Sequence, residues 1–260
     1  MKIATCLKEV PTQDSRYELA DGGMWIKESD LTFGVNECDE YALEEALKLG
    51  EEHGGEVTIL TLGCQRAEKS IRKGLAMGAD RGILIRDEKD QLKSPHAVAL
   101  ALAKVLEREK YDLILTGTQS DDWGYTQTGV LVAQLLGLPH ATIVMDIQAN
   151  PAQKTVKALR EMESGWFQWV ELPMPSLLTI QAGISQVRYA SLKGIMQAKK
   201  KEIRSIELSD LGIDFSSVPQ LEVRRVYFPT TDKKAEILEG ATEAVIEQLI
   251  EKLKKEAKVL

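Results

Sequence analysis

Short apolar runs alternate with longer amphipathic stretches from the start of the chain to residue 140. The short runs predict strands at 2–8, 81–86 and 111–117 and a turn followed by a strand at 53–63. The amphipathic stretches predict helices at 37–53, 66–77, 94–109 and 125–137. Asn36 precedes the first of these helices, and we expect its side chain to cap the free amides there. The run 111–117 is apolar on both faces, which is typical of a central strand. We therefore expect an α/β fold with an open, mostly parallel sheet and helices on both faces.

Three segments depart from this alternation. Residues 9–35 contain Pro11, Gly22 and Gly23 among short alternating pieces, so we expect an excursion with a β-hairpin. Beyond residue 140, short strands predict a mixed extension of the sheet at 141–148, 155–162, 166–172 and 176–181. The last segment carries a helix with one apolar stripe, which needs a partner surface. The sequence thus predicts a nucleotide-binding type of α/β domain over residues 1–229 and a C-terminal arm with a helix over 230–260.

Composition and charge narrow the classes of function. With 43% hydrophobic residues, the chain of 260 residues can bury a sizeable core. The formal net charge of -7 argues against nucleic-acid binding, which depends on Lys and Arg neutralising phosphates. The cysteines and histidines are scattered, so we expect reduced thiols and no metal site. The N-terminus is unlike a signal peptide and no apolar run reaches ~18 residues, so we expect a cytoplasmic protein without direct membrane insertion.

The most informative loop is GTQSDDWGYTQTG at residues 117–129, which follows the strand at 111–117 and leads into a helix. Ligands bind at the carboxyl ends of strands in open α/β sheets. Glycines let the backbone approach a ligand, and Thr126, Gln127 and Thr128 place donors at a helix N-terminus, which suits a phosphate. Because Asp121 and Asp122 add negative charge, a monophosphate or a ribose hydroxyl fits better than a polyphosphate. The alternative interpretation is a glycine-rich turn with an ordinary helix cap.

Known catalytic motifs are absent from the sequence. No GxGxxG follows the first strand, and neither GxxxxGK[ST], GxSxG nor HExxH occurs. The histidines lie in unrelated contexts, and no set of acid, base and nucleophile can be assembled. We therefore expect no catalytic side chains.

Positive charge concentrates locally in QVRYASLKGIMQAKKKEI, residues 186–203. Leu192 and Ile195 flank an expected turn in this basic context. A small exposed apolar anchor ringed by charge is a common way for transient partners to dock. The alternative is that the lysine run is a solvated face.

Several segments, in order and at matching spacing, resemble the beta subunits of electron transfer flavoproteins. The family signature reads here as ALREMESGWFQWVELPMPSLLT, residues 158–179, and Ser164 is its one departure. The segments at 6–10, 36–47, 74–83, 117–129 and 188–201 are also similar, so the resemblance covers nearly all of residues 1–212. It implies the Rossmann-like sheet of the adenine nucleotide alpha hydrolase type. A true alpha hydrolase of the ATP-pyrophosphatase type is disfavoured, because no serine- and glycine-rich phosphate loop follows the first strand.

The resemblance implies an adenine-nucleotide site. The residues at the family's contact positions are Cys6, Asn36, Glu37, Cys38, Asp39, Leu62, Gly117, Thr118, Gln119, Ser120, Asp121, Asp122, Trp123, Gly124, Tyr125, Thr126, Gln127 and Thr128. AMP occupies this site in the ordinary members, whereas electron-bifurcating relatives hold a second FAD there. This sequence departs from the family at NECD, residues 36–39, and at residues 123–125. Trp123 and Tyr125 could stack on a ligand ring or merely pack, so both ligands stay open.

The resemblance also implies partners. Leu192 stands where the family inserts a leucine anchor into an acyl-CoA dehydrogenase or similar donor, and the implied docking residues are Arg188, Tyr189, Leu192, Ile195, Lys199, Lys200 and Lys201. The working FAD is expected in an alpha subunit with which this chain forms a heterodimer, and a membrane quinone oxidoreductase is a possible acceptor. This makes the chain an electron carrier rather than a stand-alone enzyme. A flavin-independent regulatory protein that binds an adenine nucleotide is the alternative.

Overall fold

The computed structural model describes residues 1–89, 91–229 and 235–260. Within these residues, nine strands form the main sheet in the order β11-β5-β4-β1-β6-β10-β7-β8-β9. They are β1 (Lys2–Cys6), β4 (Glu56–Gly63), β5 (Arg81–Arg86), β6 (Leu113–Gly117), β7 (His140–Asn150), β8 (Thr155–Glu161), β9 (Phe167–Pro173), β10 (Ser176–Ile180) and β11 (Ile203–Glu207). The pairs from β11 to β7 are parallel, and β7-β8 and β8-β9 are antiparallel. The expected open, mostly parallel sheet is confirmed, and β6 lies at its centre.

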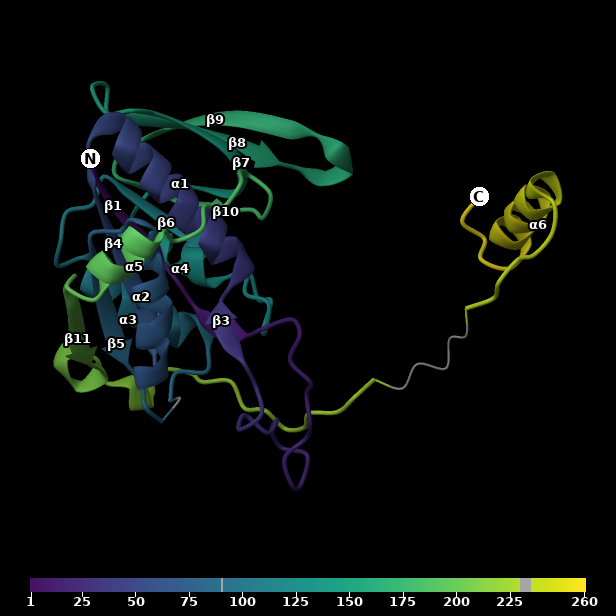
Figure 1. Ribbon diagram of the computed structural model, residues 1–260, viewed down its shortest axis with the longest axis horizontal. Helices are drawn as coiled ribbons and strands as arrows, with labels where there is room; N and C mark the ends of the chain where they lie inside the picture. The colour runs from purple at the N-terminus through teal and green to yellow at the C-terminus, as the bar shows by residue number, and fades with distance from the viewer. Residues whose placement is uncertain (90, 230–234) are drawn as a thin grey trace.

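Helices cover both faces of the sheet (Figure 1). One face packs against α1 (Glu37–His53), α2 (Glu68–Met77) and α5 (Leu192–Ala198), in a core that includes Leu43 and Ile71. The other face packs against α3 (Pro95–Leu106) and α4 (Thr128–Leu136), in a core that includes Leu102 and Val132. The apolar residues that predicted these elements therefore form the two layers of the core.

The local chemistry explains where the helices begin and end. Ser94 caps α3, since its Oγ accepts a hydrogen bond from the backbone N–H of Ala97 at 3.1 Å. Gly78, with φ 143°, ends α2. The helix expected from residue 125 begins only at Thr128, because Thr126 has φ 57° and cannot continue a right-handed helix. Short 3-10 turns lie at Gln65–Ala67, Glu163–Gly165, Leu208–Leu211 and Phe215–Ser217.

One expectation in the basic segment needs correction, and a strand that follows the segment was not expected. The turn expected between Leu192 and Ile195 is wrong, because both residues belong to helix α5, whose first turn is capped by the Ser191 Oγ accepting from the Gly194 N–H at 3.0 Å. Strand β11 was not predicted at all. It is an edge strand in which Ile206 alone is buried, so its sequence lacks the apolar run of an inner strand.

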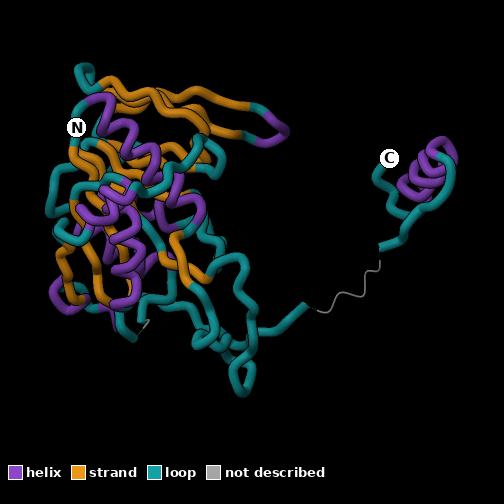
Figure 2. The backbone as a smooth tube through the Cα atoms, in the orientation of Figure 1, coloured by secondary structure: helices purple, strands orange, loops and turns teal. Residues whose placement is uncertain are grey.

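The segments that break the βα alternation form antiparallel structure. Strands β2 (Glu9–Pro11) and β3 (Phe33–Val35) pair at the base of the 9–35 excursion, which confirms the expected hairpin. Strands β7, β8 and β9 continue the sheet as a long extension that projects beyond the helices (Figure 2). This confirms the mixed portion of the sheet predicted beyond residue 140.

The C-terminal arm carries α6 (Thr242–Lys255), which stands apart from the sheet and its helices in Figure 1. Its apolar residues Ile246, Leu249 and Ile250 are exposed. The boundary expected between residues 229 and 230 falls at the edge of 230–234, which lie outside the described residues. In the part of the chain that is described, no helix combines the length and the apolarity that a membrane span requires.

Candidate nucleotide site and docking segment

The topology places a crevice at the carboxyl ends of β1 and β6. From β1 the chain moves to one side to form β4 and β5, then crosses to the opposite side of β1 to form β6. Such a switch point separates the loops that follow the two central strands, and it is where open α/β sheets bind ligands. Loop 117–128 follows β6 at this point, and Lys8 follows β1. The loop singled out by the sequence therefore lies at the switch point.

Asp39 joins the ends of these two strands. Its Oδ2 accepts a hydrogen bond from the N–H of Lys8 and its Oδ1 accepts one from the N–H of Gly117, both at 2.8 Å. The side chain belongs to the first turn of α1 and is only 7% exposed. One carboxylate thus fixes α1 against both walls of the crevice.

Asn36 and Asp121 connect the same helix to the loop. The Asn36 Nδ2 donates to the carbonyl of Gln119, and its Oδ1 accepts from the N–H of Asp121, both at 2.8 Å. The expected side-chain cap of α1 by Asn36 is therefore wrong, because no such hydrogen bond forms. Instead the Asp121 Oδ2 accepts from the N–H of Glu37 at 3.1 Å. The loop itself supplies the carboxylate that stabilises the positive end of α1.

The second loop carboxylate is also engaged. The Lys8 Nζ lies 2.6 Å from the Asp122 Oδ1 and donates to the Ser120 Oγ at 3.3 Å. The carboxylate of Asp121 accepts a hydrogen bond from α1, and that of Asp122 forms an ion pair with Lys8, so both carboxylates have partners within the protein. The repulsion that these residues would exert on a phosphate is reduced accordingly.

The loop backbone is shaped in ways that only certain residues allow. A methyl group at Gly117 would overlap the Asp39 Oδ1 and lie 2.8 Å from the Cβ of Cys38, so glycine is required for this close approach. Thr126 is β-branched and has φ 57°, a conformation that costs of order 1–3 kcal/mol. Strain of this kind clusters at ligand sites. Thr128 is the first residue of α4, so the expected donors do gather at a helix N-terminus.

Aromatic rings line the loop. Trp123 stacks on Tyr125 with ring centroids 5.6 Å apart, and it meets Trp25 at 5.8 Å in a tilted arrangement. Trp25 was not expected at this site. Since it comes from the 9–35 excursion and reaches the loop only through the tertiary fold, no local pattern signals the contact.

Two thiols and one leucine complete the expected contact set. Cys6 ends β1 and Leu62 lies near the end of the adjacent β4, at the same edge of the sheet. Burial, and then the charge of Asp39, raise the pKa of the Cys6 thiol to about 12, and burial also raises the pKa of Cys38. Both cysteines are therefore neutral, weakly nucleophilic groups at the wall of the crevice.

Burial also perturbs Asp39, which gives the first testable prediction. Desolvation raises its pKa to about 7, although the N–H donors of Lys8 and Gly117 act in the opposite direction. The folded protein binds this proton more tightly than the unfolded chain does. The contribution of Asp39 to the free energy of unfolding should therefore decrease as the pH rises from about 4 to about 7. In urea unfolding, the free energy of unfolding should differ between pH 5 and pH 7 by about 2 kcal/mol less in Asp39→Asn than in the unaltered protein. Equal pH slopes in the two proteins would show that Asp39 is ionised throughout.

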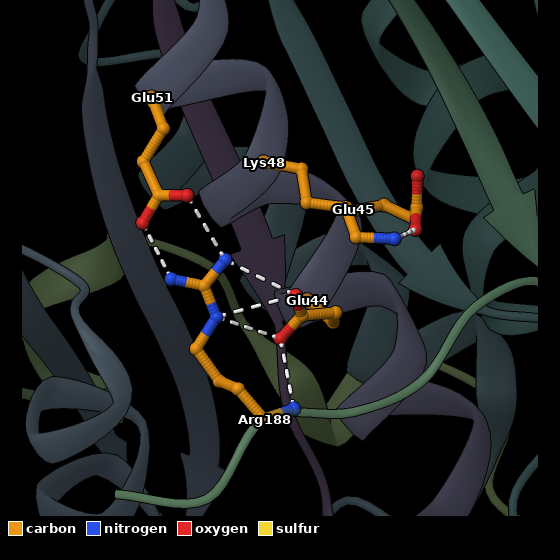
Figure 3. Close-up of polar contacts among 5 residues, drawn as sticks. All are labelled: Glu44, Glu45, Lys48, Glu51 and Arg188. Atoms are coloured by element: carbon orange, nitrogen blue, oxygen red, sulfur yellow. Dashed lines mark hydrogen bonds and ion pairs between the residues drawn. The ribbon is translucent and has the colours of Figure 1, made fainter. Parts of the chain in front are cut away.

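The docking segment is held at its base by Arg188 (Figure 3). The guanidinium bonds both oxygens of the buried Glu44, with its Nε 2.9 Å from the Oε2, and its Nη1 lies 2.5 Å from the Glu51 Oε1. Hydrogen bonding to Glu51 and Glu44 raises the pKa of Arg188, and Arg188 lowers the pKa of Glu51. Arg188 thus ties the segment to α1 rather than standing out with the neighbouring exposed residues.

The outer surface of the segment is apolar with a basic rim. Tyr189 is 96% exposed, Leu192 83%, Met196 72% and Ile195 45%. Lys193, Lys199 and Lys200 are exposed around them. Met196 was not among the expected docking residues; once α5 is known to be a helix, the i, i+4 spacing from Leu192 puts it on the same face. We call Tyr189, Leu192 and Met196 the apolar anchor.

Comparisons with known proteins show the family of this chain. The family profile described as "Electron transfer flavoprotein domain" matches residues 23–211. The chain is 37% identical over 246 residues to the electron transfer flavoprotein subunit beta of Methylophilus methylotrophus, an alignment that covers 92% of this chain and 93% of the relative. The corresponding subunit of Bradyrhizobium diazoefficiens is 36% identical over 263 residues, 100% of each chain. The chain therefore belongs to the family of electron transfer flavoprotein beta subunits.

Proposed function

We propose that this chain is the small subunit of a heterodimeric electron transfer flavoprotein. It binds an adenine nucleotide in the crevice between β1 and β6, while an alpha subunit carries the working FAD. The observation that carries the proposal is the way Asp39, Asn36 and Asp121 join loop 117–128 to α1 around that crevice. No side chain is required to react, because the chemistry belongs to the flavin.

The nucleotide we propose is AMP. A single phosphate suits the helix N-terminus at Thr128, and the loop carboxylates are already bonded to Lys8 and α1. Trp123 contacts two rings, those of Trp25 and Tyr125, whereas Tyr125 stacks on Trp123 and is still 39% exposed, so Tyr125 is the ring best able to stack on one adenine. A second FAD in the same crevice, as in electron-bifurcating relatives, is the other ligand that a row of aromatic rings favours.

The hydroxyl groups at the start of α4 provide a test of this ligand site. The double change Thr126→Val and Thr128→Val keeps the side-chain shape and removes two hydroxyl groups, of which that of Thr126 donates to the carbonyl of Tyr125 at 2.7 Å. We expect nucleotide affinity to fall roughly tenfold or more, since a hydrogen bond to a charged group contributes about 1.5–3 kcal/mol. Calorimetric titration of the nucleotide-stripped protein with AMP measures the change, with Thr155→Val on β8 as the matched control. Unchanged AMP affinity in the double variant would refute the loop assignment.

The alpha subunit is proposed to cover apolar surfaces that this chain leaves open. The hairpin of β8 and β9 exposes Trp166 by 74%, Phe167 by 53% and Trp169 by 46%. The apolar stripe of α6 is exposed as well. Large aromatic side chains are the residues that most often anchor stable interfaces. We propose that the 1–229 domain contacts the alpha subunit through the hairpin and that the 230–260 arm packs on the same partner.

The electron donor is proposed to dock on the segment 188–201. An exposed leucine surrounded by lysines fits a dehydrogenase, such as an acyl-CoA dehydrogenase, whose docking surface has an apolar pocket with an acidic rim. A membrane quinone oxidoreductase is the acceptor class that we propose downstream. A flavin-independent nucleotide-binding regulator makes the opposite prediction, namely that the chain stays colourless beside any flavoprotein subunit.

A further inference from the structure

We infer that Lys201 and Arg72 act as positioning residues that fix the docking helix α5 on α2, so that Lys201 serves partner recognition through geometry and not through its charge. The inference deepens the proposed function and rests on it. The carboxyl end of α2 receives a cation from Lys201, three residues beyond the end of α5, and the carboxyl end of α5 receives one from Arg72 of α2. We call this arrangement the reciprocal cap of α2 and α5.

Lys201 supplies one half of the reciprocal cap. Its Nζ donates to the carbonyl of Ala79 at 2.6 Å, to that of Leu75 at 3.1 Å and to that of Gly78 at 3.4 Å. These carbonyls lie at the end of α2, where a helix leaves its last acceptors without partners. An ammonium there also meets the negative end of the helix dipole. The three donor sites of the ammonium are thereby turned into the protein.

Arg72 supplies the other half, from within α2. Its Nη1 donates to the carbonyl of Ala198 at 2.7 Å and to that of Lys201 at 2.8 Å, at the end of α5. Its Nε and Nη2 bond the Oε1 of Glu68 at 3.3 and 3.2 Å, which fixes the plane of the guanidinium. Hydrogen bonds from both sides therefore set how the carboxyl end of α5, residues 198–201, lies against α2.

The two helices also approach so closely that glycine is required. A methyl group at Gly194 would overlap the carbonyl oxygen of Ala76 at the end of α2. Ala198, the last residue of α5, is buried with 3% exposure, while Leu192 and Met196 have more than two thirds of their surface exposed. The inner side of α5 is thus fully committed to α2, and its outer side carries the apolar anchor.

A helix of seven residues cannot hold its own shape. Isolated helices shorter than ~12–15 residues are marginal in water, so α5 depends on its contacts with α2. If α5 were free, each docking event would have to order it, and that entropy would be lost from the affinity for the partner. The reciprocal cap removes this loss because it holds Leu192 in one position before the partner arrives.

Two consecutive lysines allow a matched experiment on the purified heterodimer. Lys200 is exposed, whereas the ammonium of Lys201 is bonded to carbonyls. Lys200→Met and Lys201→Met remove the same charge one residue apart, and Lys104→Met on α3 controls for total charge. The rate of flavin reduction by an acyl-CoA dehydrogenase, reduced with its substrate, is measured from low salt to about 0.5 M salt, where screening is nearly complete.

The expected results differ in their salt dependence. Lys200→Met should slow reduction about threefold at low salt, and the difference should vanish at high salt. Lys201→Met should slow it roughly tenfold at every salt concentration, because a displaced anchor is not corrected by screening. Gly194→Ala changes no charge and should behave as Lys201→Met does. Identical salt profiles for Lys200→Met and Lys201→Met would overturn the inference.

Hydrogen exchange separates this inference from the proposed function. Amides of residues 192–201 should exchange at least about tenfold faster in Lys201→Met and Gly194→Ala than in Lys200→Met. Unchanged exchange in the first two variants would overturn the reciprocal cap whatever the donor. A different outcome is that hydrogen exchange responds as expected but Leu192→Ala does not slow flavin reduction by the dehydrogenase. That outcome would support the reciprocal cap and contradict the proposed docking of the donor.

Discussion

Replacing Leu192 with Ala is expected to slow electron transfer from the donor dehydrogenase by about 10- to 100-fold, while the flavin content of the heterodimer stays unchanged. The side chain is 83% exposed at the start of α5, so docking can bury nearly all of it. Burying a leucine contributes about 1.5–3 kcal/mol, which sets the size of the effect. Residues of this kind at the centre of an interface dominate its binding energy.

The measurement is the rate of flavin reduction by the donor under stopped flow, compared with reduction by dithionite. Dithionite needs no docking surface, so its rate should be the same in the variant and in the unaltered heterodimer. Leu221→Ala, at an exposed leucine outside the segment 188–201, is the matched control. If Leu192→Ala and Leu221→Ala react with the donor at the same rate, the segment 188–201 is not the docking site.

Gly117→Ala is expected to abolish nucleotide retention. It should also lower the free energy of unfolding by about 2–4 kcal/mol, because it overpacks the site and breaks a buried hydrogen bond. The added methyl group would overlap the Asp39 Oδ1 and crowd Cys38. Asp39 would have to release the Gly117 N–H, and the crevice would lose the bond that joins α1 to the end of β6.

Gly50→Ala provides the matched control for this change. Gly50 lies inside α1, where an added methyl group would come 3.2 Å from the Val57 Cγ2, and alanine favours a helix by about 1 kcal/mol over glycine. Nucleotide extraction and urea unfolding of both variants give the comparison. Retention of a full complement of nucleotide in Gly117→Ala would mean that the ligand does not occupy the crevice between β1 and β6.

The helices and inner strands could be predicted from the sequence because their signals are local. Helix α1 spans Glu37–His53 as expected, since its apolar spacing and its acidic first turn mark both its face and its start. Strand β6 was placed at the centre because both of its faces are apolar. The position of loop 117–128 could be predicted for the same reason, because the loop begins where that strand ends.

The contacts that give the site its shape could not be predicted, because they join residues far apart in the chain. Asn36 looks like a helix cap in the sequence, yet its amide bonds the loop at Gln119 and Asp121. Trp25 reaches Trp123 only after the excursion folds back. In the sequence Lys201 is one member of a lysine run, and only the structure shows that its ammonium donates to carbonyls at the end of α2. Each of these contacts depends on the tertiary fold, and no periodic pattern in the sequence signals it.

The most direct test of the proposed function is to purify the chain together with its flavin-bearing partner and to count the nucleotides in each pair by absorbance and extraction. We expect a stable one-to-one complex that contains one FAD and one AMP, with the AMP lost in Gly117→Ala and the FAD retained. Two FAD molecules and no AMP would assign the crevice to a second flavin. A chain that stays monomeric and colourless beside every flavoprotein subunit would contradict the proposed function.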